Sequence, residues 1–216
     1  MSKSTLKVIH GDQAAYPVAP TASAGSWDRI TVVSNRLPYT VQIHDSGEAT
    51  LKASSGGLVT AMTPLLRRGI AGKWIGWPGV GEEEGLEEAL RSGTGSEVDI
   101  GLVMLTPDEV EEYYLGYSNE VLYPTLLDMS DQVDRQKAIT CWATYQRVQA
   151  KFAAKICEDL GDGDIVWVHD YHLFGLAQEL RRRGKTQPTG FFLHSHTPFP
   201  KKLALEIPQK GPVLRA

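Results

Sequence analysis

The stretch IVWVHDYHLFGLAQELRRRG at residues 165–184, followed by TGFFLHSH at 189–196, decides the fold class. Residues 165–172 form an apolar run that closes in polar side chains, which is typical of a buried strand leading into a loop. The next twelve residues predict a helix, because they end in a basic turn and a glycine. Another apolar run then predicts a second strand. A strand, a helix and a strand in succession favour two parallel strands in one sheet.

The same alternation extends toward the N-terminus. We expect strands at 29–35, 72–79 and 96–106, an exposed hairpin at 41–53, and helices at 54–69, 82–93 and 107–119, the last with Thr106 as its N-cap. Apolar residues at three- and four-residue steps predict one long amphipathic helix over 133–160. The fold class is therefore α/β, a Rossmann-like parallel sheet with helices on both faces. Residues 1–26, rich in Ala, Pro, Ser and Gly, are expected to be a flexible tail before one domain over 27–216.

Composition narrows the classes of partner. The chain has 216 residues and a net charge of −4, from 22 basic and 26 acidic side chains. This balance predicts neither nucleic-acid binding nor a membrane-surface role, so we expect small molecules or proteins as partners. Cys141 and Cys157 fall on one predicted helix about 24 Å apart, too far for a disulfide. Reduced thiols and no apolar run of signal-peptide or transmembrane length predict a cytoplasmic protein.

Polar clusters follow four of the predicted strands, where ligands bind in open parallel sheets. They are Asn35-Arg36, Trp77-Pro78-Gly79, residues 169–172 (HDYH) and residues 194–196 (HSH). Each also has a structural interpretation, such as turn capping by Asn35, a core position for Trp77 or helix capping by Asp170.

The histidines at these strand ends raise the alternative of a metal-dependent hydrolase. His194 and His196 share one face of their strand, and His169 and His172 end a strand that we expect to be adjacent. No Cys or Glu stands at ligand spacing, however, and we expect neither a metal nor another cofactor.

A glycine-rich loop at 54–57 (SSGG) opens the predicted helix at 54–69. Free backbone N–H groups and the helix dipole suit such a loop to anions, and Gly56 and Gly57 permit close approach. Many helices begin with Ser-Gly merely for capping, which is the alternative here. The loop matches neither the Walker motif nor the dinucleotide fingerprint, which lowers the expectation of a nucleotide hydrolase or dehydrogenase.

Taken together, six blocks in this order resemble the trehalose-6-phosphate synthase family of glucosyltransferases. The blocks are VVSNRLP, SSGGL, WIGWPG, EEYYLGYSNEVLYP, WVHDYHL and GFFLHSHTPFP, spanning residues 30–200. The resemblance implies the N-terminal, acceptor-side domain of a two-domain GT-B fold, with the C-terminal donor domain absent. It implies a retaining transfer of glucose from a nucleotide-glucose, such as UDP-glucose, to glucose 6-phosphate in trehalose biosynthesis.

The resemblance also implies roles for individual residues. Arg36 would contact the acceptor phosphate, while Trp77, Tyr114 and Tyr123 would line the acceptor site. Asp170 would accept hydrogen bonds from acceptor hydroxyls, and Gly56 and Gly57 would lie against the donor diphosphate. The histidine after GFFL would bond the donor glucose near the reacting carbon. Anchoring the family pattern on GFFL selects His194, whereas anchoring it on PFP selects His196.

Departures from the family pattern keep alternatives open. The HSHTPFP segment has two extra residues, and Leu122-Tyr123-Pro124 stands where the family has Leu-Trp-Pro. One alternative is a non-catalytic sugar-phosphate-binding homologue or regulatory subunit. A second is a related synthase with another acceptor, such as glycerol 3-phosphate. A homo-oligomer or a partner chain would supply the donor half.

Overall fold

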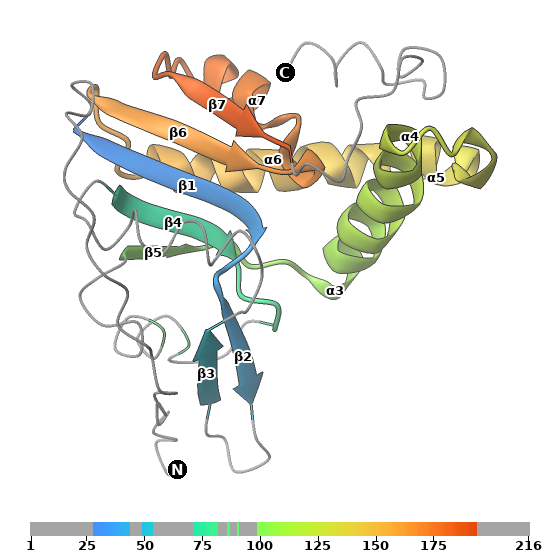
Figure 1. Cartoon of the computed structure of the whole chain (residues 1–216), viewed down its shortest axis with the longest axis horizontal. Helices are drawn as coiled ribbons and strands as arrows, with labels where there is room; N and C mark the ends of the chain where they lie inside the picture. The colour runs from blue at the N-terminus through green and yellow to red at the C-terminus, as the bar shows by residue number, and fades with distance from the viewer. Residues whose placement is uncertain are drawn as a thin grey trace.

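A parallel sheet organises the protein in the computed structural model, which describes residues 28–43, 49–53, 71–81, 86, 90 and 99–193. Five strands in this described part pair in the order β5-β4-β1-β6-β7, every pair parallel (Figure 1). They are β1 (Arg29–Arg36), β4 (Ala71–Trp77), β5 (Asp99–Leu102), β6 (Asp164–His169) and β7 (Thr189–Phe192). The expected hairpin is confirmed as β2 (Tyr39–Ile43) paired antiparallel with β3 (Ala49–Ala53).

Both faces of this sheet are buried, as its apolar strands predict. Val33 and Ile75 point into one core cluster, which also contains side chains from the helices after β5 and β6. Their neighbours Val32 and Trp74 point the other way into a second cluster. Leu86 and Leu90, two helical residues four positions apart, belong to that second cluster. The expectation of helices on both faces is confirmed.

The helix predicted after Thr106 is present and longer than expected. It runs through α3 (Pro107–Glu109), the π-helical segment η2 (Val110–Leu122) and α4 (Tyr123–Leu126). Thr106 accepts from the Glu109 N–H, and the Glu109 carboxylate accepts from the Thr106 N–H, which forms a capping box. This helix carries Tyr113 and Tyr117 into the first core cluster, and the partly buried Tyr114 packs against that cluster.

The prediction of one helix over 133–160 is wrong in one respect. The short η3 (Ser130–Gln132) precedes α5 (Arg135–Thr140), and a break at Cys141 separates α5 from α6 (Trp142–Cys157). Asp134 caps α5 by accepting from the Lys137 N–H, so α5 has its own start signal. The apolar face of α6 (Tyr145, Val148, Phe152 and Ile156) covers the sheet as predicted. Both cysteines are free thiols.

The predicted strand at 165–172 is also shorter than expected. β6 stops at His169, and η4 (Tyr171–Leu173) leads into α7 (Leu176–Arg182). Asp170 has φ 73° and therefore cannot continue the strand, and its carboxylate accepts from the Tyr171 N–H to begin η4. The chain thus turns away from the sheet at Asp170, one residue after β6 ends.

Charged side chains form a paired cluster at the amino end of the strands, here called the amino edge. Asp164 is 4 % exposed and accepts from the Arg29 guanidinium at 2.8 Å and from the Gly161 N–H at 2.8 Å. Lys73, also buried, lies 3.1 Å from Asp159. The hydrogen bond to Asp164 raises the pKa of Arg29. Arg29 and Lys73 are thus both paired with carboxylates at this edge.

Candidate functional site

The opposite, carboxyl edge of the sheet is where the predicted site residues collect. Arg36 is the last residue of β1, and its backbone is held in place from both sides. Ser34 donates its hydroxyl to the Arg36 carbonyl at 2.6 Å, and the Leu37 N–H donates to the Trp77 carbonyl at 2.9 Å. These two hydrogen bonds fix the backbone at Arg36. The side chain extends from there toward Trp77 on the neighbouring strand β4.

The Arg36 guanidinium lies over the Trp77 ring, with its central carbon 4.6 Å from the ring centroid. A cation over an indole is attracted by about 0.5–2 kcal/mol. Trp77 is itself fixed, because its indole N–H donates to the Val80 carbonyl at 3.1 Å. Within the described ranges Arg36 has no carboxylate partner, so its five N–H donors are available to an anion.

Gly79 makes this position of Arg36 possible. It has φ 86°, a conformation that L side chains rarely adopt, and a Cβ there would overlap the Arg36 guanidinium. Glycine therefore serves both the backbone turn after Pro78 and the close approach of the cation.

An aromatic row runs from Trp77 along the carboxyl edge. Trp77 and Tyr114 meet edge to face at 6.0 Å, and Tyr114 stacks on His172 at 5.7 Å between centroids. His172 in turn stacks on Tyr171 at 4.1 Å, and Tyr171 lies 5.6 Å from Tyr123. The row therefore brings together the three aromatic residues that were predicted for the site, from β4, η2 and α4, and adds Tyr171 and His172 between them.

His172 is held as a neutral ring in this row. Burial lowers its pKa from 6.5 to about 3, because the protonated form loses its hydration. Its Nδ1 is buried and has no hydrogen-bond partner in the part of the chain that the structure describes. In that same part, no group of three or more His, Cys, Asp or Glu side chains could hold a metal ion.

Asp170 stands directly before the row in the sequence, at the carboxyl end of β6. Its N–H donates to the Phe192 carbonyl at 2.9 Å, which ties it to β7. The capping interpretation of Asp170 holds, since its carboxylate accepts from the Tyr171 N–H at 3.1 Å. A carboxylate has about four acceptor sites, so its two oxygens can accept several hydrogen bonds at once. Left-handed backbone at a non-glycine residue is also common at ligand-binding positions.

Two hydrogen bonds to asparagine side chains stabilise the site, and the sequence alone did not predict either of them. Tyr113 donates its hydroxyl to the Asn35 amide oxygen at 3.0 Å, and burial raises the pKa of this tyrosine. Tyr171 donates to the Asn119 amide oxygen at 3.1 Å. The first bond ties η2 to the residue before Arg36, and the second ties η2 to η4. The only sequence signal was that Tyr113 and Asn119 flank Tyr114 within the block at 111–124.

Four predicted site residues lie outside the described residues. They are Gly56 and Gly57 of the expected donor loop, and His194 and His196 of the two-histidine segment. The expected tail at 1–26 lies outside them as well, and the boundaries of the expected domain stay a prediction. No helix among the described residues has both the length and the apolar character needed to cross a bilayer.

Fold and site together define a class, a parallel α/β domain with a cationic and aromatic binding edge at the carboxyl ends of its strands. Comparison with known proteins makes the class specific. The family model for glycosyltransferase family 20 matches residues 28–214, and the chain belongs to this family.

Curated relatives agree with that assignment. The chain is 35% identical over 176 residues to the alpha,alpha-trehalose-phosphate synthase [UDP-forming] of Candida albicans, covering 80% of this chain and 36% of the relative. It is 34% identical over 205 residues to a synthase of the same description from Aspergillus niger, covering 92% of this chain and 42% of the relative. The chain therefore spans about two fifths or less of the length of these relatives.

Solved structures show the same fold. The trehalose 6-phosphate synthase of Burkholderia multivorans superposes with a TM-score of 0.67 at 33% identity, over 88% of this chain and 37% of that one. The Burkholderia xenovorans enzyme in complex with glucose-6-phosphate gives 0.63 at 28% identity, over 87% of this chain and 37% of that one. The chain corresponds to the N-terminal part of these glycosyltransferases, as the motif order predicted.

Proposed function

We propose that this chain is the acceptor-binding part of a retaining glucosyltransferase that moves glucose from UDP-glucose to glucose 6-phosphate. The observation that carries the proposal is Arg36, a cation fixed over Trp77 at the carboxyl edge with no carboxylate partner in the described ranges. A guanidinium fork of this kind suits the phosphate of a sugar phosphate. UDP-forming trehalose-phosphate synthases among the relatives support the donor and the reaction.

The acceptor sugar has a defined place in this proposal. Trp77 and Tyr114 form one wall beside the phosphate, and Tyr123, 44% exposed at the far end of the aromatic row, forms the other. The Asp170 carboxylate accepts hydrogen bonds from acceptor hydroxyls. Aromatic faces exclude water on the apolar side of the sugar, while one carboxylate fixes its rotation.

In the proposed reaction, the anomeric hydroxyl of glucose 6-phosphate attacks the anomeric carbon of the donor glucose as the bond to the diphosphate breaks. Configuration is retained, so attack comes from the face that the diphosphate leaves, and the departing diphosphate is the group that takes up the proton. Positioning of the two sugars and stabilisation of the diphosphate supply most of the catalysis. Gly56 and Gly57 would approach the diphosphate, and His194 or His196 would bond the donor glucose.

The test is calorimetric titration of the 216-residue chain and its Arg36→Ala variant with glucose 6-phosphate and with glucose. Two charge-assisted hydrogen bonds are lost in the variant, so we expect glucose 6-phosphate affinity to fall about 100-fold. Glucose affinity should change less than about threefold. Arg147→Ala is the matched control, because this side chain is 57% exposed and lies outside the carboxyl edge.

Three outcomes would contradict the proposal. Equal losses for both ligands would remove the phosphate role of Arg36. Tighter binding of glycerol 3-phosphate than of glucose 6-phosphate would point to another acceptor. Turnover is checked separately, by adding UDP-glucose and measuring UDP release from the complete protein; binding without release would identify a non-catalytic sugar-phosphate binder.

A further inference from the structure

The helical segment η2, which contributes Tyr114 to the carboxyl edge, is π-helical over 13 residues. In a π-helix each backbone N–H donates to the carbonyl five residues before it, and one such bond joins the Tyr123 N–H to the Ser118 carbonyl. This register is rare, occurs mostly as single turns and is frequent at functional sites. The length of η2 in this register is therefore unusual, and its effect on the site can be worked out from the spacing of its residues.

The burial pattern of η2 follows the wide turn of a π-helix. With about 4.4 residues per turn, side chains on one face recur at steps of four and five. The exposed residues of η2 have this spacing, and they are Glu111, Leu115 and Glu120. Side chains on the core face have it too, among them Tyr113, Tyr117 and Leu122, each 0% exposed. In an α-helix, with about 3.6 residues per turn, Tyr113 and Leu122 would lie on opposite faces.

The same register aligns the aromatic residues assigned to the acceptor site. Tyr114 and Tyr123 are nine positions apart, which is about two turns of a π-helix but about two and a half turns of an α-helix. Both rings therefore lie on the side of the helix that faces the carboxyl edge. There Tyr114 meets Trp77, and Tyr123 meets Tyr171. Asn119 lies between them along the helix and accepts from the Tyr171 hydroxyl.

The sequence ends the π-helical register at a defined position. Pro124 has no N–H to donate to the Glu120 carbonyl four residues before it, and its ring would crowd that carbonyl in an α-helix. The Glu120 carbonyl accepts instead from the Asp134 N–H at 3.0 Å. Bonding of the α-helical kind follows, with the Leu127 N–H donating to the Tyr123 carbonyl at 3.1 Å. The wide register thus ends directly after it has placed Tyr123.

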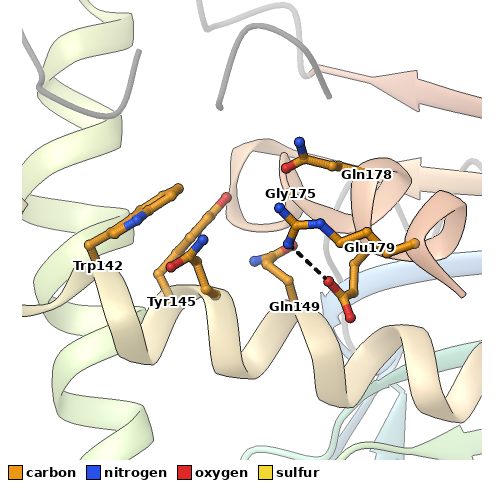
Figure 2. Close-up of a pocket in the computed structure, with 8 residues that line it drawn as sticks. Trp142, Tyr145, Gln149, Gly175, Gln178 and Glu179 are labelled. Carbon is orange, nitrogen blue, oxygen red and sulfur yellow. Dashed lines mark hydrogen bonds and ion pairs between the residues drawn. The ribbon is translucent and has the colours of Figure 1, made fainter. Parts of the chain in front are cut away.

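Contacts with other elements hold η2 in this register. On the core side, Tyr117 packs on Trp142 and Tyr145, which extend side by side from α6 (Figure 2). The centroids of these two rings lie 5.3 and 4.6 Å from that of Tyr117. On the sheet side, Tyr113 donates its hydroxyl to Asn35 at the end of β1. A rotation of η2 into another register would break contacts on both sides.

We propose that the π-helical register of η2 is the positioning element of the acceptor site, because it turns Tyr114 and Tyr123 toward the same ligand. The inference rests on the proposed acceptor function. It divides the work of recognition between two elements. Arg36 and Trp77 come from β1 and β4, so the sheet places the contact with the phosphate, whereas η2 places the contacts with the sugar.

The experiment changes the register without removing a side chain from the core or the site. Leu115 is 41% exposed, and its deletion leaves eight positions between Tyr114 and Tyr123. One residue of a π-helix corresponds to a rotation of about 80°, so the two rings could no longer both face the carboxyl edge. By calorimetry, we expect glucose 6-phosphate affinity to fall at least about tenfold. Affinity for inorganic phosphate, which Arg36 binds, should change less than about threefold.

The matched rescue deletes both Leu115 and Glu120, two exposed residues on the outer face of η2. Seven positions then separate Tyr114 and Tyr123, which is about two turns of an α-helix, so both rings face the edge again. Tyr113, Tyr117 and Leu122 also stay on one face under this spacing. We expect glucose 6-phosphate affinity to return to within about threefold of wild type. Deletion of Glu120 alone should weaken binding as deletion of Leu115 does, and Leu115→Ala, which keeps the register, should bind like wild type.

Nuclear Overhauser contacts measure the placement of the rings without a ligand. Wild type and the double deletion should show contacts of Tyr114 with Trp77 and of Tyr123 with Tyr171, whereas each single deletion should show at most one of the two. Both contacts in a single deletion would overturn the proposal. So would wild-type glucose 6-phosphate affinity in a single deletion, equal losses in the single and double deletions, or loss of inorganic phosphate binding along with the sugar.

These measurements separate the inference from the proposed function. If the contacts follow the expected pattern but wild type does not bind glucose 6-phosphate, η2 places the two rings as proposed and the acceptor assignment fails. If wild type binds glucose 6-phosphate and the single deletions bind it equally well, the acceptor assignment stands and the positioning role of the register fails.

Discussion

The amino and carboxyl edges of the sheet differ in how their charged side chains are paired. At the amino edge, Arg29 and Lys73 are opposed by Asp159 and Asp164. At the carboxyl edge, Arg36 lies on the same strand as Arg29, but its guanidinium lies over the face of an indole and has no carboxylate partner among the described residues. The charges at the amino edge are neutralised within the fold, whereas Arg36, for which we propose a ligand, has no carboxylate partner among the described residues. The comparison predicts that substitutions at the first edge affect stability and those at the second affect binding.

The largest expected effect is that of Asp164→Ala at the amino edge. This change removes the acceptor of three hydrogen bonds and leaves Arg29 without its buried partner. We expect the free energy of unfolding to fall by about 3 kcal/mol, less than for a fully buried pair because Arg29 is part exposed. Glu158→Ala is the control and should cost less than about 1 kcal/mol, since Glu158 is 56% exposed and its ion pair with Lys155 lies at the surface. Comparable losses in urea unfolding would show that burial of Asp164 does not matter.

The next effect is a pH dependence that originates at His172. Its pKa is about 3 in the folded chain, against 6.5 ordinarily, so as pH falls through 6.5 the unfolded chain takes up a proton that the folded chain does not. Stability from this group is therefore fully present at neutral pH, declines below 6.5 and is lost by about pH 3. Between pH 7 and pH 5 the decline should be about 1–2 kcal/mol.

His172→Phe tests that assignment, because phenylalanine keeps an aromatic ring in the row but has no titrating group. The variant should show a flatter stability profile over this interval in denaturant unfolding at several pH values. A wild-type imidazole that titrates near 6.5 by NMR would contradict the neutral ring.

A smaller effect is expected from Gly79→Ala, which tests the contact that positions Arg36. Alanine at φ 86° should cost about 1 kcal/mol, and its Cβ would displace the guanidinium from Trp77. Glucose 6-phosphate affinity should fall about tenfold. Gly184→Ala is the matched control, because it has φ 74° but nothing within 4 Å of a Cβ, so it introduces the strain alone. If both variants bind glucose 6-phosphate like wild type, Arg36 does not need its place over Trp77.

The smallest effect should be that of Arg36→Ala on stability. No ion pair is lost among the described residues, only a cation–π contact at the surface, so the free energy of unfolding should change by less than about 1 kcal/mol. Chemical unfolding of the ligand-free variant measures this. A loss as large as that of Asp164→Ala would mean that the two edges do not differ as described.

Local sequence signals predicted the elements that carry the site. Thr106 caps the following helix as expected, and the strand ending at Arg36 and the one ending near Asp170 lie side by side in the sheet. Such patterns are local, since each is set by a few neighbouring residues. The break at Cys141 was missed because the apolar spacing continues through it, while the Asp134 cap signals only a start.

Contacts between distant segments could not be predicted in the same way. The Tyr113–Asn35 bond joins residues 78 positions apart, and the Gln149–His172 bond joins two helical segments whose packing sets their distance. The aromatic row depends on how η2 lies against the sheet, which no spacing along η2 specifies. Residue types at the strand ends predicted a ligand-binding site at the carboxyl edge. The hydrogen bonds that stabilise this site could be identified only in the three-dimensional structure.

The position of β1 in the middle of the sheet has a consequence for synthesis on the ribosome. β1 emerges first among the described strands, yet its partner β6 begins 135 residues after Arg29. At ordinary elongation rates that strand edge stays open for roughly 7–27 s, during which Val32 and Val33 have no second neighbour. A nascent chain in this state is prone to pairing with other chains. We therefore expect folding in the cell to benefit from protection of β1 until residue 169 has left the exit tunnel.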